Sequence, residues 1–405
     1  MPLIHPTVHL LAWPDLVPSA LSVTRAAAAT RVTAFGRIET VAAGTLRHDF
    51  DPATGVYRGW LLEAARTNHV LFSSAMTDAL WQTAAATVAA GSATAPDGAG
   101  AADRVTEDSA TAIHTLYQED LAFSAGQSYT LSIFARSAGR ERLQLVLPST
   151  AFGAVQSAVF DLTTGTVGFV EGTASPAIEA LPDGWYRCAI TATATTTVAL
   201  APIHFRLRDT GGSSTYAGDG TSGVHVWGAQ VEDGAGATSF IATGATAVTR
   251  PADQVSLALG ADAVNPREGS LLVCGTVPDG QSAVLAEVSD GSTANRIAVA
   301  FDTSGGGGAD ASVVTVGATV AALTQAGVSG GLESRCAVAY AADDFAQSVN
   351  GLAPATDTAG AVPSGLSTLT LGGGVGGAVG PRCWVRQVGL FPRRLPDADL
   401  QTVTL

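Results

Sequence analysis

The residues best suited to ligand binding are polar side chains that alternate with apolar ones along two short stretches, 142–147 and 202–208. Successive side chains of an extended strand point to opposite faces, so the polar members of each stretch face the same way. The polar set is Arg142, Gln144, His204, Arg206 and Arg208. Guanidinium groups pair with carboxylates through two parallel hydrogen bonds, and they also bond sugar hydroxyls. If the two strands share a sheet, the pattern predicts a carbohydrate-binding surface, with acidic polysaccharide as the ligand class to test.

An apolar platform for a sugar ring would complete such a surface, and we expect Tyr216, in a loop beyond 208, to supply it. A solvated polar face explains the same alternation, because the outer faces of antiparallel sheets are commonly polar. Both interpretations stay open on the sequence alone.

Other motifs are weaker candidates for a catalytic or metal-binding site. The segment 327–331 matches G-x-S-x-G, but a strand pattern follows it where a nucleophile elbow needs a helix, and no histidine lies beyond it. The cluster at 48–51 has oxygen ligands that suit calcium, although a turn beginning at Asp51 explains the same residues and is the favoured interpretation. Adjacent carboxylates such as Asp343 and Asp344 point to opposite faces of a strand and form no acid–base pair. We therefore expect no enzyme activity, no catalytic metal and no cofactor, with a structural calcium ion left open.

Charge and composition argue against several classes of protein. The chain of 405 residues has a net charge of -14, and all 21 of its basic residues are arginine. Binding to nucleic acid requires a basic stripe, so it is not expected. No apolar run reaches the roughly 18 residues of a membrane span, and the N-terminus lacks the basic region of a secretory signal. We expect a folded protein made in the cytoplasm without a signal peptide.

Alternation with a period of two residues dominates the rest of the chain and predicts an all-β protein. Strands are expected at 128–136, 142–148, 157–162, 185–194, 202–208 and 223–231, and Asp-Gly pairs suit the tight turns between them. One short helix is expected from Pro396 to about Thr402. The four cysteines lie far apart in strand-like runs, so we expect them to be buried and unpaired.

The chain divides into three segments by pattern. Residues 1–59 read as an irregular lead-in, 60–255 as one set of strands and 256–405 as a second set. Each set has enough strands for a two-sheet β-sandwich.

Several motifs, taken together, resemble a module of bacteriophage tail-fibre and spike proteins. They are R-x-D-x-D-P-x-T-G at 47–55, E-x-x-R-T-N at 63–68, A-P-D-G at 95–98, D-G-W-Y-R-C at 183–188, W-G-A-Q-x-E-x-G at 227–234 and T-R-x-A-D at 249–253. The resemblance implies a carbohydrate-binding jelly roll over 60–255. The segment 256–405 is similar to the concanavalin A-like, or laminin G-like, sandwich of the same proteins. Gene transfer agents carry similar spikes.

Within these motifs we expect structural roles. Trp227 shares a strand face with Val231, so it is expected in the core, as is Trp185 or Tyr186. Asn68 is expected to satisfy backbone groups at a strand entry.

The resemblance implies adhesion to host-cell surface polysaccharide by a spike or fibre of a phage-like particle. The segment 1–59 would attach to other particle proteins, and the chain would act as a homo-oligomer at the particle surface. Two alternatives stay open. A structural connector would bind no glycan and would bury the arginine-rich face against a neighbouring subunit, and a surface-glycan hydrolase would need two carboxylates about 5–10 Å apart in one cleft.

Overall fold

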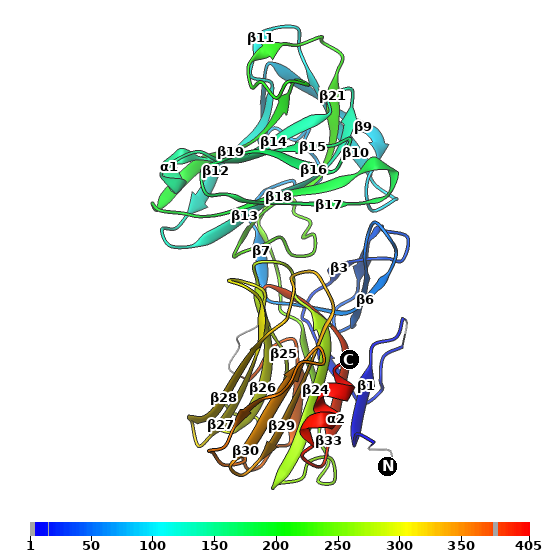
Figure 1. Cartoon of the computed structure of the whole chain (residues 1–405). Helices are drawn as coiled ribbons and strands as arrows, with labels where there is room; N and C mark the ends of the chain where they lie inside the picture. Colours follow the sequence, from blue (N-terminus) through cyan, green and yellow to red (C-terminus); the bar gives the residue numbers. More distant parts are fainter. Residues whose placement is uncertain (1–4, 15, 376–379) are drawn as a thin grey trace.

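The computed structural model describes residues 5–14, 16–375 and 380–405, and it contains two β-sandwiches set one above the other (Figure 1). The helices in this part of the chain are short: α1 (Ser149–Phe152), α2 (Asp397–Val403) and the 3-10 turn η1 (Pro182–Gly184). The predicted all-β class and the predicted C-terminal helix are confirmed. Nowhere in the described residues is a helix long and apolar enough to cross a membrane.

The upper sandwich in Figure 1 consists of two six-stranded sheets. The sheet that faces the lower sandwich, here the joint sheet, has the order β17 (Ser175–Ala180), β18 (Tyr186–Thr193), β13 (Ser128–Ala138), β21 (Gly223–Asp233), β10 (Ala101–Glu107), β9 (Ala86–Thr94). The other, here the distal sheet, has the order β16 (Thr166–Glu171), β15 (Gln156–Asp161), β14 (Arg142–Leu147), β19 (Val198–Arg208), β12 (Thr115–Phe123), β8 (Trp81–Ala84). Leu131, Leu145 and Phe205 belong to the core between them.

The lower sandwich also has two sheets. One has the order β31 (Ala355–Asp357), β30 (Asp344–Val349), β29 (Ser334–Ala341), β24 (Glu268–Thr276), β33 (Arg382–Phe391), β6 (Tyr57–Glu63), β5 (Arg47–Phe50), with β1 (Val8–Leu11) also on β33. The other has the order β2 (Ser22–Thr24), β23 (Gln254–Ala258), β32 (Thr368–Leu371), β25 (Ser282–Ser289), β26 (Arg296–Asp302), β27 (Gly308–Thr315), β28 (Ala318–Ala326).

The predicted irregular lead-in at 1–59 is wrong where the segment forms strands, because β1, β2, β5 and the start of β6 complete the lower sandwich and β3 and β4 form a hairpin. Strands β1 and β6 pair with β33 near the end of the chain, and β2 pairs with β23. The upper sandwich is therefore an insertion between β6 and β23. Strand β6 crosses the predicted boundary between 59 and 60, and β23 crosses the one between 255 and 256. Both strands belong to the lower sandwich. Strands of three to seven residues with partners so far along the chain leave little pattern in the sequence.

Two further elements join the sandwiches. Strands β7 (Arg66–Asn68) and β22 (Val248–Arg250) pair where the chain enters and leaves the upper sandwich (Figure 1). The hairpin of β3 (Ala29–Val32) and β4 (Ile38–Val41) packs against the joint sheet. In that contact Ile38 belongs to one cluster with Phe134, Trp227 and Phe240, and the ring centroids of Trp227 and Phe240 lie 4.5 Å apart.

A buried ion-pair network lies at the same joint. Its members are Arg25, Arg47, Glu63, Arg250 and Asp253. Arg47 donates to the Glu63 carboxylate at 2.7 Å, and a nitrogen of Arg250 lies 3.2 Å from the same carboxylate. Ser239, from the upper sandwich, donates its backbone amide and its hydroxyl to Glu63 at 2.7 and 2.6 Å. Residues of the motifs at 47–55, 63–68 and 249–253 therefore meet in one structural network.

The structural roles predicted within the motifs are confirmed. The Asn68 side-chain amide donates to two carbonyls and accepts from the backbone amides of Val70 and Val231. Trp185 and Trp227 are buried as predicted, in the cluster at the joint. The predicted common face of Trp227 and Val231 is wrong, because a register shift between Trp227 and Gln230 leaves Val231 in the core between the two sheets. All four cysteines are buried and free.

Candidate functional site

The predicted binding residues share a sheet, because β14 and β19 pair side by side in the distal sheet. Their apolar neighbours Leu143, Leu145, Ile203 and Phe205 are buried in the core, so the polar side chains face outward. The register arranges the outward residues in three rows across the strands. The rows are Gln82, Tyr117, His204, Val146, Ser157 and Glu171; then Thr115, Arg206, Gln144 and Val159; then Arg208, Arg142, Asp161 and Thr166. We call this surface the arginine face.

Arg208 and Gln144 form the fixed part of the arginine face. The Nε and Nη2 atoms of Arg208 both donate to the side-chain oxygen of Gln144, with Nε at 3.0 Å. The Gln144 amide donates to Ser157 at 2.8 Å, and the Ser157 hydroxyl donates to Glu171 at 3.2 Å. Gln144, Ser157 and Arg208 are buried, so they support the surface and offer few free donors to a ligand.

Arg206 differs from its neighbours in having no direct ionic or hydrogen-bonding partner in the described part of the chain. It is half-buried, and it makes no hydrogen bond or ion pair with any residue that the structure describes. Its Nε is shielded from solvent without an acceptor. Burial lowers the pKa of Arg206, and the negative charge of Glu171 only partly offsets this effect. A guanidinium stays charged in proteins, so a partly desolvated cation here lacks its counter-ion.

The positive charge on this face extends beyond Arg206. Arg142 lies opposite Arg208 in the register, and its Nε is 3.8 Å from the carboxylate of Asp161. Burial, followed by the charge of Arg206, lowers the pKa of Arg208. Three guanidinium groups thus share neighbouring positions on a chain whose net charge is -14. The arrangement favours an anionic ligand group, which would relieve their mutual repulsion.

His204 extends the arginine face toward β12. It lies opposite Tyr117, with the ring centroids 5.2 Å apart, and the Tyr117 hydroxyl donates to Gln82 at 2.9 Å. Burial and the charge of Arg206 lower the pKa of His204 to about 4. The imidazole is therefore neutral at pH 7, with hydrogen-bonding capacity suited to hydroxyl groups.

Tyr216, which was predicted to be the apolar platform for a sugar ring, does not lie on the arginine face. Tyr216 lies in the short strand β20 (Tyr216–Ala217), paired with β11 (Thr111–Ala112), and not in a loop beside Arg206. It is buried, its hydroxyl donates to Glu107 at 2.7 Å, and the guanidinium of Arg140 covers its ring. Tyr216 therefore offers no open ring to a sugar. Tyr216 comes after the turn at 209–212, so alternation along β19 did not constrain where its ring would lie.

Phe169 is the better apolar candidate on this surface. It comes two residues before Glu171 on β16, at the edge of the distal sheet, and is 65% exposed. Glu171 faces the arginine face because it lies opposite Ser157, and Phe169 lies beside it, at the register shift between β15 and β16. The sequence analysis missed Phe169 and Tyr117. Alternation along β12 could have identified Tyr117, because Leu116 faces the core and the next residue must face outward.

The candidate calcium residues have structural partners. Asp51 accepts hydrogen bonds from the backbone amides of Ala53 and Thr54, which confirms the turn. Asp49 accepts from the Val32 amide and from the Trp384 indole. No group of three metal-ligating side chains occurs within the described ranges.

Comparisons with known proteins give weak likenesses only. No protein-family model matches the chain. No curated protein matches it either. Among solved structures, the CBM40 of the Ruminococcus gnavus IT-sialidase bound to alpha2,3 sialyllactose matches at 17% identity and a TM-score of 0.29, covering 35% of this chain and 84% of that one.

Two other solved structures cover more of the chain. Domains LG4-5 of the mouse laminin alpha1 chain match at 10% identity and a TM-score of 0.24, covering 71% of this chain and 94% of that one. The CBM22-1-CBM22-2 tandem domain of Paenibacillus barcinonensis Xyn10C matches at 9% identity and a TM-score of 0.25, covering 83% and 98%. At these values the likenesses carry no functional conclusion, which must come from the side chains.

Proposed function

We propose that the protein binds acidic carbohydrate through the arginine face of its upper sandwich, without catalysing a reaction. The observation that carries the proposal is Arg206, a half-buried guanidinium with no protein partner within the described chain. A sugar carboxylate paired bidentately with Arg206 would supply the absent counter-ion. Arg142 and His204 lie within the neighbouring rows, where they would contact the rest of the sugar, and Phe169 would provide an apolar surface.

We further propose that this binding is adhesion to host-cell surface polysaccharide by a spike or fibre of a phage-like particle. The support is the combination of motifs at 47–55, 63–68 and 227–234. Several copies on one particle would raise the avidity of individually weak sites. The chain would be made in the cytoplasm and carried on the particle surface.

Replacing Arg206 tests the binding proposal. A charge-assisted bidentate contact contributes about 1.5–3 kcal/mol, so Arg206→Ala should weaken binding of an acidic polysaccharide roughly tenfold to a hundredfold. Isothermal titration with a uronate-rich capsular polysaccharide and with its carboxyl-reduced form measures this effect. Arg267→Ala is the matched control, because Arg267 is an exposed arginine on the lower sandwich.

Equal heats for the native and the carboxyl-reduced polysaccharide would contradict the role of the carboxylate. No binding at all by folded wild-type protein would favour the structural connector, and a neighbouring subunit should then cover Arg206.

The low pKa of His204 predicts how the affinity for acidic polysaccharide depends on pH. Because its pKa is about 4, His204 stays neutral between pH 5.5 and 8, and the arginines stay positively charged over the same interval. Affinity for the acidic polysaccharide should therefore change less than twofold over that interval, measured by titration calorimetry at constant ionic strength. Tighter binding as the pH falls through about 6.5, where an ordinary histidine becomes charged, would show that His204 titrates in the site.

A further inference from the structure

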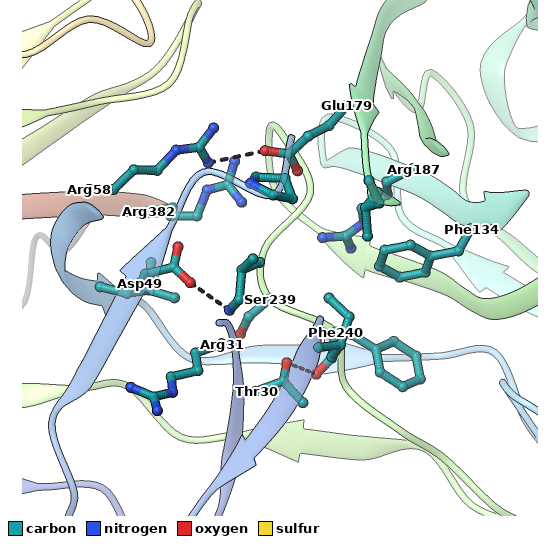
Figure 2. Close-up of a pocket in the computed structure, with 15 residues that line it drawn as sticks. Thr30, Arg31, Asp49, Arg58, Phe134, Glu179, Arg187, Ser239, Phe240 and Arg382 are labelled. Atoms are coloured by element: carbon teal, nitrogen blue, oxygen red, sulfur yellow. Dashed lines mark hydrogen bonds and ion pairs between the residues drawn. The ribbon is translucent and has the colours of Figure 1, made fainter. Parts of the chain in front are cut away.

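A groove of about 550 Å³ runs between the joint sheet and the lower sandwich. The upper wall includes Ala177 and Glu179 of β17 and Arg187 of β18, and the lower wall includes Gln281 and Arg382. A small cavity of about 30 Å³ adjoins it and shares Glu179, Arg187 and Arg382 in its lining. Figure 2 shows this cavity, with Arg58 and Arg382 close together on one side and Glu179 and Arg187 on the other. The groove has the size of a small-molecule site.

Two arginines that line this groove, Arg382 and Arg187, form no ion pair within 4.0 Å with any described residue. Arg382 makes no hydrogen bond or ion pair with any described residue; its guanidinium lies 4.6 Å from the Trp384 ring centroid, and its Nε is shielded from solvent without an acceptor. Arg58, by contrast, pairs with Glu179 at 3.0 Å and with Asp51 at 2.8 Å. Arg58 therefore has direct ion pairs, whereas Arg382 beside it interacts with the buried carboxylates of Asp49 and Glu63 only at longer range.

Arg187 strengthens the case, because it is almost completely buried. It is 7% exposed; its Nη1 donates to the Thr238 carbonyl at 2.6 Å and its Nη2 to the Ser132 hydroxyl at 3.1 Å. Its Nε has no partner, and within the described chain no carboxylate lies within 4.0 Å of its nitrogens. Burial lowers the pKa of Arg187, and the more distant negative charges of Glu232 and Glu179 offset this only in part, so its desolvation is not fully compensated. An anion held in the groove would offset that cost.

We propose that the groove between the two sandwiches is a second binding site, for a small molecule that carries a carboxylate or phosphate group. Arg382 would contact the oxyanion, and Arg187 would stabilise it from the buried side. Ser175, Thr191 and Gln281, which also line the groove, offer hydrogen bonds to hydroxyl groups. The site is independent of the arginine face, which lies on the other sheet of the upper sandwich.

The test uses the full chain carrying Arg206→Ala, which removes the principal contact of the arginine face. Glucuronate and inorganic phosphate are titrated separately by calorimetry, and they distinguish a carboxylate from a phosphate ligand. We expect saturable one-to-one binding of at least one probe. Adding Arg382→Gln should weaken it at least tenfold, and Ala177→Trp, which fills the groove without removing charge, should do the same.

Absence of saturable binding for both probes at millimolar concentration would overturn the proposal, and so would binding that neither added variant changes. If Arg382→Gln fails to fold, Ala177→Trp alone decides, because Ala177 is exposed in the groove wall. The outcome is separate from that of the arginine face. Arg382→Gln in the otherwise unchanged chain should bind acidic polysaccharide as the wild type does if the two sites are independent.

Discussion

Glu63→Ala should lower the free energy of unfolding by about 3–5 kcal/mol, because it removes one of the two buried carboxylates that pair with Arg47 and Arg250 and leaves only Asp253. Glu63 is fully buried, accepts from Arg47 at 2.7 Å and lies 3.2 Å from Arg250. It also accepts two hydrogen bonds from Ser239, so the substitution removes a tie between the two sandwiches. Chemical denaturation followed by tryptophan fluorescence measures the change.

Glu39→Ala is the matched control for this effect. Glu39 pairs with Arg31 at 2.7 Å, but its side chain is 47% exposed. Exposed pairs contribute about 0–1 kcal/mol, so the control should lose no more than that. Similar losses of unfolding free energy in both variants would contradict the claim that burial makes the Glu63 network strongly stabilising.

The same network gives stability a pH dependence. Burial alone would raise the pKa of Glu63, but Arg250, Arg47 and the Ser239 hydrogen bonds outweigh it and hold the pKa well below its usual range. The carboxylate is ordinary in the unfolded chain, with a pKa of about 4.3. Its stabilising contribution is therefore complete above that value and is lost as the pH falls further. The decline in stability between about pH 5 and 3 should be shallower in Glu63→Gln than in the wild type.

Trp227→Ala should also lower the free energy of unfolding by about 3–5 kcal/mol, as large aromatic truncations in cores do. Trp227 is 6% exposed and packs against Phe240 and Phe134, with ring centroids 4.5 and 5.4 Å away. Ile38 of the β3–β4 hairpin belongs to the same cluster. The cavity would therefore loosen the hairpin, and hydrogen exchange of the amides at 29–41 should accelerate.

Trp13→Ala controls for loss of an indole, because Trp13 is 63% exposed. Its effect should stay within about 0.5 kcal/mol, as for other surface substitutions. A loss of less than 1 kcal/mol in Trp227→Ala would mean that the aromatic cluster does not hold the joint.

Short-range alternation predicted three of the six strands of the distal sheet, β14, β15 and β19. The strands at 142–148 and 202–208 appear as β14 and β19, and their apolar residues face the core as expected. A period of two residues fixes which side chains share a face whatever the strand pairs with, so this inference needed no tertiary information.

Long-range pairing was beyond the sequence patterns. The short strands β1, β2, β5 and β6 owe their place to partners elsewhere in the chain, and their three to seven residues carry too little periodicity to reveal them. The predicted lead-in was consequently separated from the sandwich that it completes.

The different contacts of Arg206 and Arg208 on the arginine face could not be predicted from the sequence either. Arg206 and Arg208 are two residues apart on one strand and look equivalent in sequence. The side-chain oxygen of Gln144 accepts from Arg208, which leaves Arg206 without a partner among the described residues. The choice depends on the cross-strand register and on Ser157, which fixes the Gln144 amide.

The most direct test of the acidic-carbohydrate proposal is to follow the arginine side-chain Nε–H signals by NMR during titration with a uronate-containing oligosaccharide. The Arg206 signal is assigned by its loss in Arg206→Ala, and a neutral oligosaccharide of equal length serves as the reference. We expect the Arg206 signal to shift and saturate with the acidic ligand only. An Arg206 signal that stays unchanged while the protein is saturated with the acidic ligand would contradict the proposed site.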